Sequence, residues 1–406
     1  MKILFITDNF PPERNAPAKR TFEHTKNWAQ SGHEVTVITG VPNFPVGKVF
    51  DGYKNKLFQK ETVKNINVKR VWTYIAENKG FMLRIIDYVS FMISSFICGI
   101  FTKKNDIVIA TSPQFFSAIS GYLISLFKKS HYILEIRDLW PESIVTVGAM
   151  KESSLAIKIL SKIALFLYRR AKIIVCVTDS FKQDLINKGI DSDKIIVIRN
   201  GFNFENILNP TKTIKQVEKA YNLNCNDFII SFIGTIGMAH GLNVILKASK
   251  NIDKKVKFLI VGDGAEKEIL KQKAQNDSIN NVIFISSISW QEIINLNQII
   301  SVNLVHLIDS PEFRKVIPSK IFESMAFKKP IIMGVLGEAN KIIQDAKCGI
   351  EMIPENPESL KEVINILLDN PSMIKELGEN GYKCVKNNYN RHHLANQMID
   401  FIKNKL

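Results

Sequence analysis

The stretch KILFIT at residues 2–7, followed by SGHEVTVIT at residues 31–39, decides the fold class. Each contains an apolar run typical of a buried strand, and a helical stretch that ends near Gln30 lies between them. A strand, a helix and another strand in this order are typical of a parallel sheet. Gly32 marks the point where the helix is expected to end.

The same alternation recurs along the chain, with an interruption at residues 202–227, which are polar and include Pro210. The strands are almost wholly apolar, which indicates helices on both faces of each sheet. We predict an α/β fold of two Rossmann-like parallel-sheet domains, residues 1–203 and 204–390, facing across a cleft, with a helix at 391–406 packing back on the first domain. Further strands are predicted within 106–111, 132–138, 172–179, 194–201, 228–237, 256–264, 281–286, 302–307 and 329–335.

Length and composition agree with two cores and with a reducing environment. The chain has 406 residues, about twice what one core usually organises. Its five cysteines form no CxxC pair and no cysteine-histidine spacing of a metal site, and this favours reduced thiols in a cytoplasmic protein. The start does not resemble a signal peptide, and the uncharged apolar stretch at 88–101 is shorter than the roughly 20 residues of a spanning helix. We therefore predict no membrane-spanning segment.

The net charge of +15 is concentrated in the first half of the chain. Residues 1–200 hold 29 Lys and Arg against 17 Asp and Glu, whereas residues 201–406 hold 25 against 22. The first half is expected to meet an anionic partner, although a solvated lysine-rich surface explains the charge equally well. Two stretches, 80–104 and 155–173, mix apolar and basic residues. This pattern is typical of helices that lie in an anionic membrane interface, and equally of core helices whose lysines reach out to solvent. We favour peripheral membrane association.

The stretch PSKIFESMAFKKPII at residues 318–332 predicts a phosphate and ribose site. Pro318 suits the first turn of a helix, where backbone N–H groups attract anions. Lys320 adds a positive charge in that turn, and Glu323 lies on the same face. Ser319 and Glu323 are one residue too far apart for a capping box, so the carboxylate is available to two ribose hydroxyls. The alternative is a plain surface pair of lysine and glutamate.

Two glycine-containing loops follow predicted strands in the second half. GTIGMAHGL at 234–242 has Gly234, Gly237 and Gly241, which let a phosphate approach the backbone. VGDG at 261–264 adds Gly262 and a second glycine. The spacing is not that of the dinucleotide fingerprint, so a nicotinamide enzyme is weakly supported. His240 is either a phosphate donor or incidental. The sequence shows no metal-ligand pattern, and DSD at 191–193 is interpreted as a solvated turn.

Together with DNFPPERNAPAKR at 8–20, RDLWPES at 137–143 and Asn200-Gly201, these motifs resemble glycosyltransferase family 4, whose members are retaining enzymes of the GT-B fold. Within it the chain is most similar to the bacterial surface-polysaccharide branch that includes the WbuB-like N-acetyl-L-fucosaminyltransferases. The resemblance implies a nucleotide-sugar donor on the second domain and an acceptor on the first. From the residues themselves we predict no metal, and we predict no cofactor.

The resemblance also implies roles for individual residues. The paired-glutamate motif of the family places Glu323 on the ribose, and its first glutamate falls at Lys315. The first glycine loop of the family often carries Arg and Lys, and the matching positions here are Thr235 and His240, so neither cation is present. Lys320, with Arg314 or Lys315, must then neutralise the diphosphate. For the first domain it implies Asp138 and Arg137 near the reacting groups. The residues expected to contact the acceptor are Glu13, Arg14, Asn15 and Arg20.

The implied activity is retaining transfer of a sugar, N-acetyl-L-fucosamine or a similar one, from a UDP-sugar to a polyprenyl-diphosphate-linked saccharide in O-antigen or capsule synthesis. It would take place on the inner face of the plasma membrane. One alternative is a nucleotide-sugar 2-epimerase of the same two-domain shape. Another is a non-enzymatic binder of nucleic acid or membrane. Nucleic acid is disfavoured, because basic and aromatic residues do not interleave as in single-strand binders.

Overall fold

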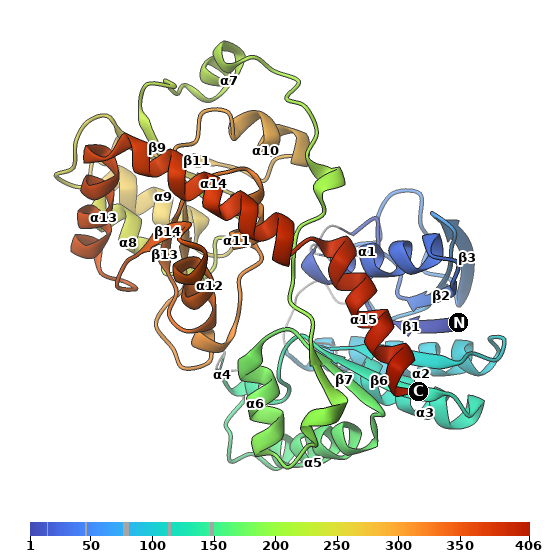
Figure 1. Ribbon diagram of the computed structural model, residues 1–406. Helices are drawn as coiled ribbons and strands as arrows, with labels where there is room; N and C mark the ends of the chain where they lie inside the picture. Colours follow the sequence, from blue (N-terminus) through green and yellow to red (C-terminus); the bar gives the residue numbers. More distant parts are fainter. Residues whose placement is uncertain (14, 45–46, 76–80, 113–114, 147–149) are drawn as a thin grey trace. The chain divides into compact units, whose positions relative to one another are not determined.

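The computed structural model describes residues 1–13, 15–44, 47–75, 81–112, 115–146 and 150–406, and it divides into two compact units (Figure 1). The first unit comprises Met1–Asn200 and Arg391–Leu406, and the second comprises Gly201–Asn390. The boundary lies three residues before the predicted one. Phe202 explains the difference, because it is buried in a core of the second unit and its N–H donates to the carbonyl of Tyr389 at 2.9 Å.

The first unit is built on an eight-stranded sheet with the order β3-β4-β2-β1-β5-β6-β7-β8. All neighbouring strands are parallel except β3, which pairs antiparallel with β4 at the edge. The strands are β1 (Lys2–Ile6), β2 (Glu34–Thr39), β3 (Phe58–Val63), β4 (Ile66–Val71), β5 (Ile107–Thr111), β6 (His131–Ile136), β7 (Ile173–Cys176) and β8 (Ile195–Val197). The helices are α1 (Ala16–Gln30), α2 (Phe81–Ile100), α3 (Phe115–Lys128), α4 (Glu142–Thr146), α5 (Leu155–Arg170), α6 (Asp179–Asn187), η1 (Ser192–Lys194) and α15 (Arg391–Lys405).

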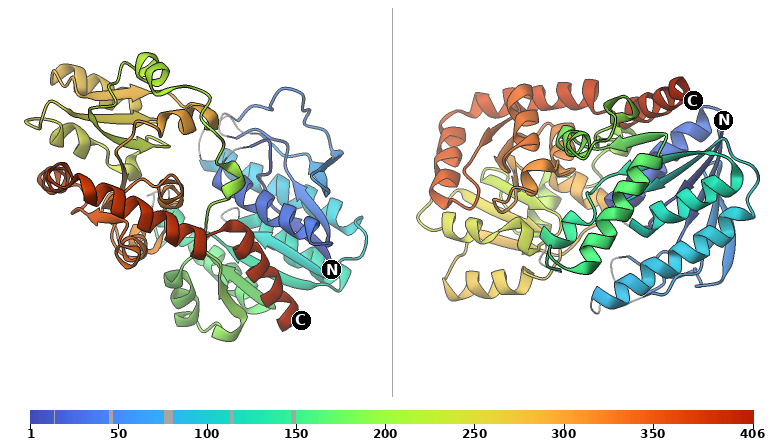
Figure 2. Two further views of the ribbon diagram at one scale, coloured as in Figure 1. Left: turned by 45° about the horizontal axis from the view of Figure 1, so that its top comes forward. Right: turned by 90° about the horizontal axis from the view of Figure 1, so that it is seen from below.

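Helices cover both faces of this sheet, which is why its central strands are apolar throughout. On one face Trp28 of α1 and several residues of α15 join the core with alternate strand residues. Trp28 also donates its ring N–H to the carbonyl of Ala395 at 2.8 Å, and α15 lies along α1 (Figure 2). On the other face α3 approaches so closely that a methyl group on Gly121 would lie 2.5 Å from the Cβ of Ala110.

The antiparallel pair of β3 and β4 is not among the predicted strands. The two strands are joined by Lys64 and Asn65, which adopt left-handed conformations with φ of 49° and 67°. Such a two-residue turn matches the natural twist of a hairpin. The stretch FQKETV-KN-INVKRV at 58–71 does carry the signal, since apolar and polar residues alternate around the Lys-Asn pair.

The second unit has a six-stranded parallel sheet with the order β11-β10-β9-β12-β13-β14. Side chains of α8, α9 and α13 cover one face, and α7, α10, α11, α12 and α14 supply the cores on the other. The strands are β9 (Phe228–Ile233), β10 (Val256–Val261), β11 (Val282–Ile285), β12 (Val302–His306), β13 (Ile331–Gly334) and β14 (Gly349–Glu351). The helices are η2 (Phe204–Asn206), α7 (Ile214–Tyr221), η3 (Met238–His240), α8 (Asn243–Ala248), α9 (Lys267–Asn276), α10 (Trp290–Leu296), η4 (Phe313–Lys315), α11 (Lys320–Ala326), α12 (Glu338–Ala346), α13 (Pro357–Asp369) and α14 (Pro371–Asn388). The predicted α/β class, with two Rossmann-like parallel-sheet units, is confirmed.

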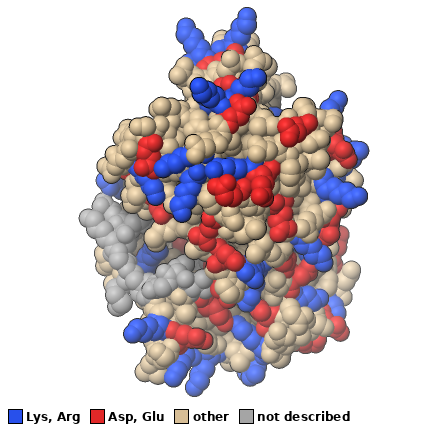
Figure 3. Space-filling view, turned by 90° about the vertical axis from the view of Figure 1, so that its left-hand side faces the viewer, with Lys and Arg blue, Asp and Glu red and all other residues tan. Residues whose placement is uncertain are grey.

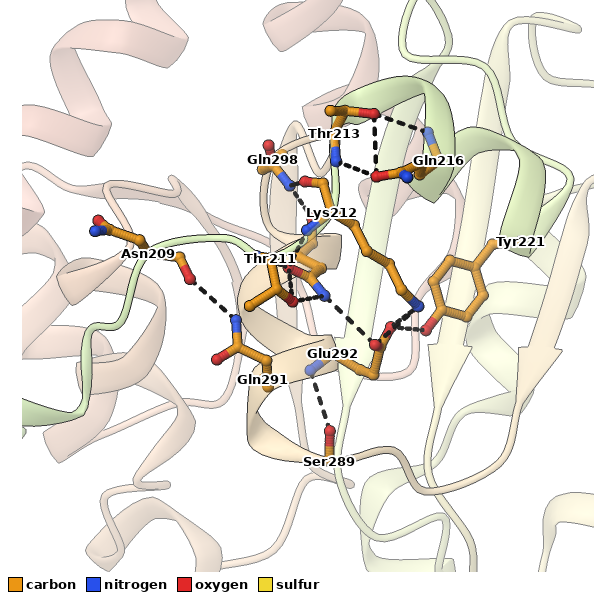
Figure 4. Close-up of polar contacts among 11 residues, drawn as sticks. Asn209, Thr211, Lys212, Thr213, Gln216, Tyr221, Ser289, Gln291, Glu292 and Gln298 are labelled. Carbon is orange, nitrogen blue, oxygen red and sulfur yellow. Dashed lines mark hydrogen bonds and ion pairs between the residues drawn. The ribbon is translucent and has the colours of Figure 1, made fainter.

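The segment that enters the second unit is attached to α10 by polar contacts (Figure 4). Lys212 and Tyr221 both reach the carboxylate of Glu292, at 2.8 Å and 3.0 Å. Gln291 donates to the carbonyl of Asn209 at 3.0 Å, and Gln298 donates to that of Lys212 at 2.9 Å. Burial, together with the neighbouring carboxylate, raises the pKa of Tyr221 to about 12. Residues 209–221 are therefore fixed to the domain that they lead into.

Within the described ranges, α2 contains an 18-residue stretch, Leu83–Ile100, that is long and apolar enough to cross a membrane, with a mean hydropathy of 1.6. This finding qualifies the prediction that the chain has no spanning segment, although a single such helix is weak support for a span. The helix also packs within the first unit. The hydroxyls of Ser95 and Ser120 lie 2.8 Å apart and buried, and a methyl group on Gly99 would lie 2.3 Å from Ile124.

On the face of the molecule shown in Figure 3, basic and acidic side chains are intermingled rather than segregated. Surface ion pairs occur among the described residues, such as Lys328 with Glu379 at 2.8 Å. Exposed pairs of this kind contribute little to stability. Because basic and acidic side chains are mixed on the face shown in Figure 3, that face has no field of one sign that would attract a polyanion.

Candidate functional site

The two glycine loops of the second unit contact each other through their backbones. The N–H of Gly234 donates to the carbonyl of Val261 at 2.8 Å, and that of Ile236 donates to Asp263 at 3.0 Å. Gly262 has a φ of +148°, and a Cβ at this position would lie 1.8 Å from the carbonyl oxygen of Gly234. Gly262 is thus required for the contact between the loops, and its predicted contact with a phosphate stays a prediction.

Lys320, the first residue of α11, reaches over the first glycine loop. A Cβ built on Gly234 would lie 2.6 Å from Cε and 2.7 Å from Nζ of Lys320. The ammonium lies 3.6 Å from the centroid of the Phe232 ring, and among the described residues it has no hydrogen-bond partner. Burial lowers the pKa of Lys320 to about 7, although Glu323 partly opposes the shift. An enclosed ammonium without a partner is suited to an anionic ligand.

A buried chain of hydrogen bonds positions the first turn of α11 against the sheet. Ser231 of β9 donates to the side-chain carbonyl of Asn303 on β12. Asn303 donates to the hydroxyl of Ser324 at 2.9 Å, and Ser324 donates to the backbone carbonyl of Lys320 at 2.9 Å. Because the chain joins two central strands to α11, Lys320 is held by the rigid part of the unit.

Glu323 lies one turn beyond Lys320, in the first turn of α11. Both side chains line a small cavity of about 30 Å³, together with Ser231, Asn303 and Ser324. A cavity of this size holds about one water molecule. The side chain of Ser319 does not cap the helix, as the spacing to Glu323 predicts.

His240 and His306 form a reciprocal pair beside the first glycine loop. Nδ1 of His306 donates to the carbonyl of His240 at 2.6 Å, and Nδ1 of His240 lies 3.3 Å from the carbonyl of His306. Since a carbonyl only accepts, both rings carry their proton on Nδ1. Nε2 of His306 accepts from the N–H of Glu355 at 2.9 Å. Burial, with Lys320 second, lowers the pKa of His240 to about 4, so this neutral ring offers a ligand an acceptor at Nε2 rather than a donor.

Sequence reasoning does not identify His306, because a lone histidine at the end of an apolar strand has many explanations. Its two nitrogens join the glycine loop to the turn at Glu355. We expect His306→Leu to lower the free energy of unfolding by about 2–4 kcal/mol, since it leaves two partly buried backbone groups unpaired. His306→Asn keeps a donor near Nδ1 and should lose about half as much. Denaturant unfolding of the three proteins measures this, and a leucine variant as stable as the parent would contradict it.

The other predicted donor-site residues of the same unit are exposed or half-buried. Arg314 forms a two-point ion pair with Asp309, at 2.9 Å and 2.8 Å. Lys315 lies 3.6 Å from Glu312. Both cations therefore lie within ion-pair distance of a carboxylate, whereas the Lys320 ammonium has no hydrogen-bond partner among the described residues. Thr235 is exposed in the loop after β9. Gly237 has an ordinary extended conformation with φ of −128°.

Two family models match this chain, one in each unit. The model described as Glycosyltransferase Family 4 matches residues 18–206, and the model described as Glycosyl transferases group 1 matches residues 213–384. The chain belongs to the GT-B glycosyltransferases. WcaI of Escherichia coli K12, a glycosyl transferase named for colanic acid biosynthesis, is 25% identical over 70% of this glycosyltransferase and 71% of its own length. The capsular polysaccharide biosynthesis glycosyltransferase CapM of Staphylococcus aureus is 21% identical over 84% of each chain.

Solved structures share the fold of this glycosyltransferase. HepE of Anabaena, crystallised in complex with UDP-glucose, superposes with a TM-score of 0.73 over all of both chains at 14% identity. An identity this low establishes the two-unit architecture alone.

In the loop after β1 of this glycosyltransferase, the side chain of Glu13 binds to the protein's own backbone. Glu13 is buried, and its carboxylate accepts from the N–H groups of Asn43 and Phe44, both at 2.9 Å. A third N–H, that of Phe10, donates to it at 3.3 Å. Burial raises the pKa of Glu13, while these backbone donors lower it. These contacts let Glu13 order the loop, and its predicted acceptor contact stays a prediction. Arg14 lies outside the described residues.

Asn15 and Arg20 also have structural partners. Asn15 caps α1 by accepting from the N–H of Ala18 at 2.9 Å. Arg20 is buried, and its guanidinium pairs with Glu135 at 2.9 Å. It also donates to the carbonyls of Ile198 and Arg199, each at 2.9 Å, so it fixes the end of the first unit. For an acceptor contact, Arg20 would have to exchange a buried hydrogen bond, and Asn15 the partly buried bond that caps α1.

Arg137 and Asp138 follow β6, beside the buried pair of Arg20 and Glu135. Nη1 of Arg137 is enclosed and has no hydrogen-bond partner among the described residues. Burial lowers the pKa of Arg137 to about 10, so it remains charged at neutral pH. Burial alone would raise the pKa of Glu135, but Arg20 and Arg137 bring it below its usual value. The backbone carbonyl of Asp138 accepts from Ser112 at 3.2 Å, which fixes the start of this loop.

Proposed function

We propose that this glycosyltransferase is a retaining enzyme that takes its sugar from a UDP-sugar bound to the second unit. One observation carries the proposal: the enclosed Lys320 ammonium lies against Gly234, with Glu323 one turn along the helix. An ammonium at the glycine loop can neutralise a diphosphate, and a carboxylate can accept from both ribose hydroxyls. The crystallised complex of HepE with UDP-glucose supports this choice of donor.

In the proposed reaction the acceptor hydroxyl attacks the anomeric carbon on the face from which the diphosphate departs. The bond from the anomeric carbon to the acceptor oxygen forms, the bond to the diphosphate oxygen breaks, and the diphosphate takes the hydroxyl proton. Charge on the leaving group grows during this step, so Lys320 contributes most in the transition state. The protein itself supplies no general base and no metal in this mechanism.

The proposed acceptor is a saccharide linked to polyprenyl diphosphate, and the proposed process is synthesis of a surface polysaccharide such as O-antigen or capsule. The names of WcaI and CapM support the process. N-acetyl-L-fucosamine, or a similar N-acetylated deoxyhexose, is the proposed sugar. Calorimetry with a panel of UDP- and GDP-sugars tests the donor, and UDP release with and without lipid-linked saccharide tests transfer. A chain that binds no nucleotide sugar would end the proposal, and a new sugar isomer formed without acceptor would indicate the epimerase.

We also propose that the first unit lies on the anionic inner face of the plasma membrane. Exposed apolar side chains follow one face of α2 at Ile86, Ile93 and Ile97. Others lie on α3, which packs against α2, and on α5, which packs against α3. These are Phe101 just after α2, Leu123, Leu126 and Phe127 on α3, and Leu155, Ile159 and Phe166 on α5. Exposed lysines and arginines flank them, including Lys103, Lys104, Lys129, Lys158, Lys162, Arg169 and Arg170.

Flotation with phosphatidylglycerol vesicles tests the membrane proposal. The double variant Ile93→Asp/Ile97→Asp should reduce the bound fraction at least tenfold, because it places two carboxylates in the apolar stripe. Ile366→Asp is a matched control, since Ile366 is an exposed apolar residue on α13 of the second unit. Equal flotation of all three proteins would contradict the proposal.

A further inference from the structure

Exposed aromatic residues follow the carboxyl ends of two paired strands, β2 and β4, in the first unit. Trp72 and Tyr74 follow β4 with exposed fractions of 36% and 38%, while Thr73 between them is buried. Because buried and exposed residues alternate here, the two rings lie on the same side of an extended segment. Phe44, 47% exposed, lies in the loop after β2, the strand that pairs with β4. We call Phe44, Trp72 and Tyr74 the aromatic shelf.

The backbone under the shelf is held by side-chain contacts. The N–H of Tyr74 donates to Ser90 at 2.8 Å, and Asn55 donates to the carbonyl of Thr73 at 2.8 Å. The hydroxyl of Thr73 donates to Asp87 of α2. Phe44 is fixed through its own N–H, which Glu13 accepts at 2.9 Å. Exposed rings on a fixed backbone lose little conformational entropy when a ligand covers them.

Arg70 joins the shelf to the loops that follow the neighbouring strands. Its guanidinium is buried and donates to the carbonyls of Gly40, after β2, and Pro11, after β1. The ring of Tyr53 covers it at 4.9 Å. Loops at the carboxyl ends of parallel strands are where α/β units bind ligands. The shelf is therefore continuous with the edge of the sheet that carries the proposed acceptor loop.

We propose that the aromatic shelf binds a saccharide, with Trp72 and Tyr74 stacking on pyranose rings of the acceptor. This inference rests on the proposed glycosyl transfer and adds a site to it. A pyranose offers flat C–H faces to an aromatic ring and hydroxyls to nearby polar groups, and this edge supplies the exposed rings together with the phenol of Tyr74. The exposed stripe on α2, α3 and α5 differs, because helical backbone groups are already paired and leave only apolar and ammonium groups.

An array of defined oligosaccharides, probed with the full chain, tests the shelf. We expect the parent protein to retain at least one oligosaccharide, and Trp72→Ala/Tyr74→Ala to lower that signal at least tenfold. Trp72→Phe should keep most of it, because a phenyl ring still stacks. Ile269→Ala, at an exposed apolar residue of α9, should leave it unchanged. Thermal unfolding checks that the variants are folded, and the exposure of both rings predicts small shifts.

Three results would overturn the inference: no oligosaccharide is retained by the parent, the double variant retains as much as the parent, or the double variant loses vesicle flotation instead of saccharide. UDP calorimetry separates this failure from failure of the proposed function. If all variants bind UDP alike and the array signal does not change, the shelf is wrong and the donor site stands. If the parent binds no UDP, the proposed function itself is wrong.

Discussion

Replacing Lys320 by methionine should lower UDP affinity at least 100-fold and raise the melting temperature by several degrees. Methionine fills the space along Gly234 and Phe232 without a charge. The affinity falls because the diphosphate loses its enclosed cation. The stability rises because the ammonium is buried without a hydrogen-bond partner in the unliganded protein. Calorimetry with UDP and a thermal scan without ligand measure the two effects. A stabilised variant that still binds UDP would show that the phosphates lie elsewhere.

The pKa of Lys320 gives both effects a pH dependence. It is about 7 in the folded protein, below the ordinary value of 10.5. The folded state therefore carries the full cost of the charge below pH 7, and this cost fades as the pH rises toward 10.5. The gain in melting temperature of Lys320→Met should be largest near pH 7 and shrink toward pH 10.

UDP binding requires the protonated lysine, so affinity for the parent should fall about tenfold per pH unit between pH 7 and 9. This range lies above the phosphate pKa of about 6, which limits interference from UDP itself. Lys320→Arg keeps its charge throughout and serves as the matched control. A parallel fall in affinity for the arginine variant would remove Lys320 as the cause.

The parts of this structure that follow local rules could be predicted from the sequence, and the parts that depend on distant residues could not. The apolar runs at 106–111 and 302–307 become β5 and β12, because a strand covered on both faces must be apolar throughout. The first turn of α11 is visible from Pro318. The distance between this turn and Gly234 could not be predicted, because Pro318 and Gly234 are 84 residues apart in the sequence.

Charged residues show the same limit. Glu13 and Arg20 belong to the stretch 8–20, for which the sequence predicts acceptor contacts. In the structure Glu13 accepts from backbone N–H groups, and Arg20 on α1 pairs with Glu135. Whether a charge in a loop is solvated or buried depends on what the fold brings next to it. His306 is a further case, because its partners at His240 and Glu355 come from different loops.

Gly262→Ala should be the most disruptive small substitution in the second unit. The added methyl group would lie 1.8 Å from the carbonyl oxygen of Gly234, and a φ of +148° is strained for alanine. Both loops are held by backbone hydrogen bonds, so neither can move without breaking them. We expect the free energy of unfolding to fall by about 3–5 kcal/mol, with loss of UDP binding as the first loop is displaced.

Gly237→Ala is the matched control in the first loop. At this position φ is −128°, and the nearest atom to an added methyl group is Cγ2 of Thr235, at 3.9 Å. This variant should unfold like the parent, within about 0.5 kcal/mol. Its UDP affinity then answers a separate question. If the diphosphate of UDP passes close to Gly237, the methyl group weakens binding without changing stability. Gly262→Ala, in contrast, lowers both the UDP affinity and the stability. Equal behaviour of the two variants would show that contact between the loops does not set the shape of the phosphate site.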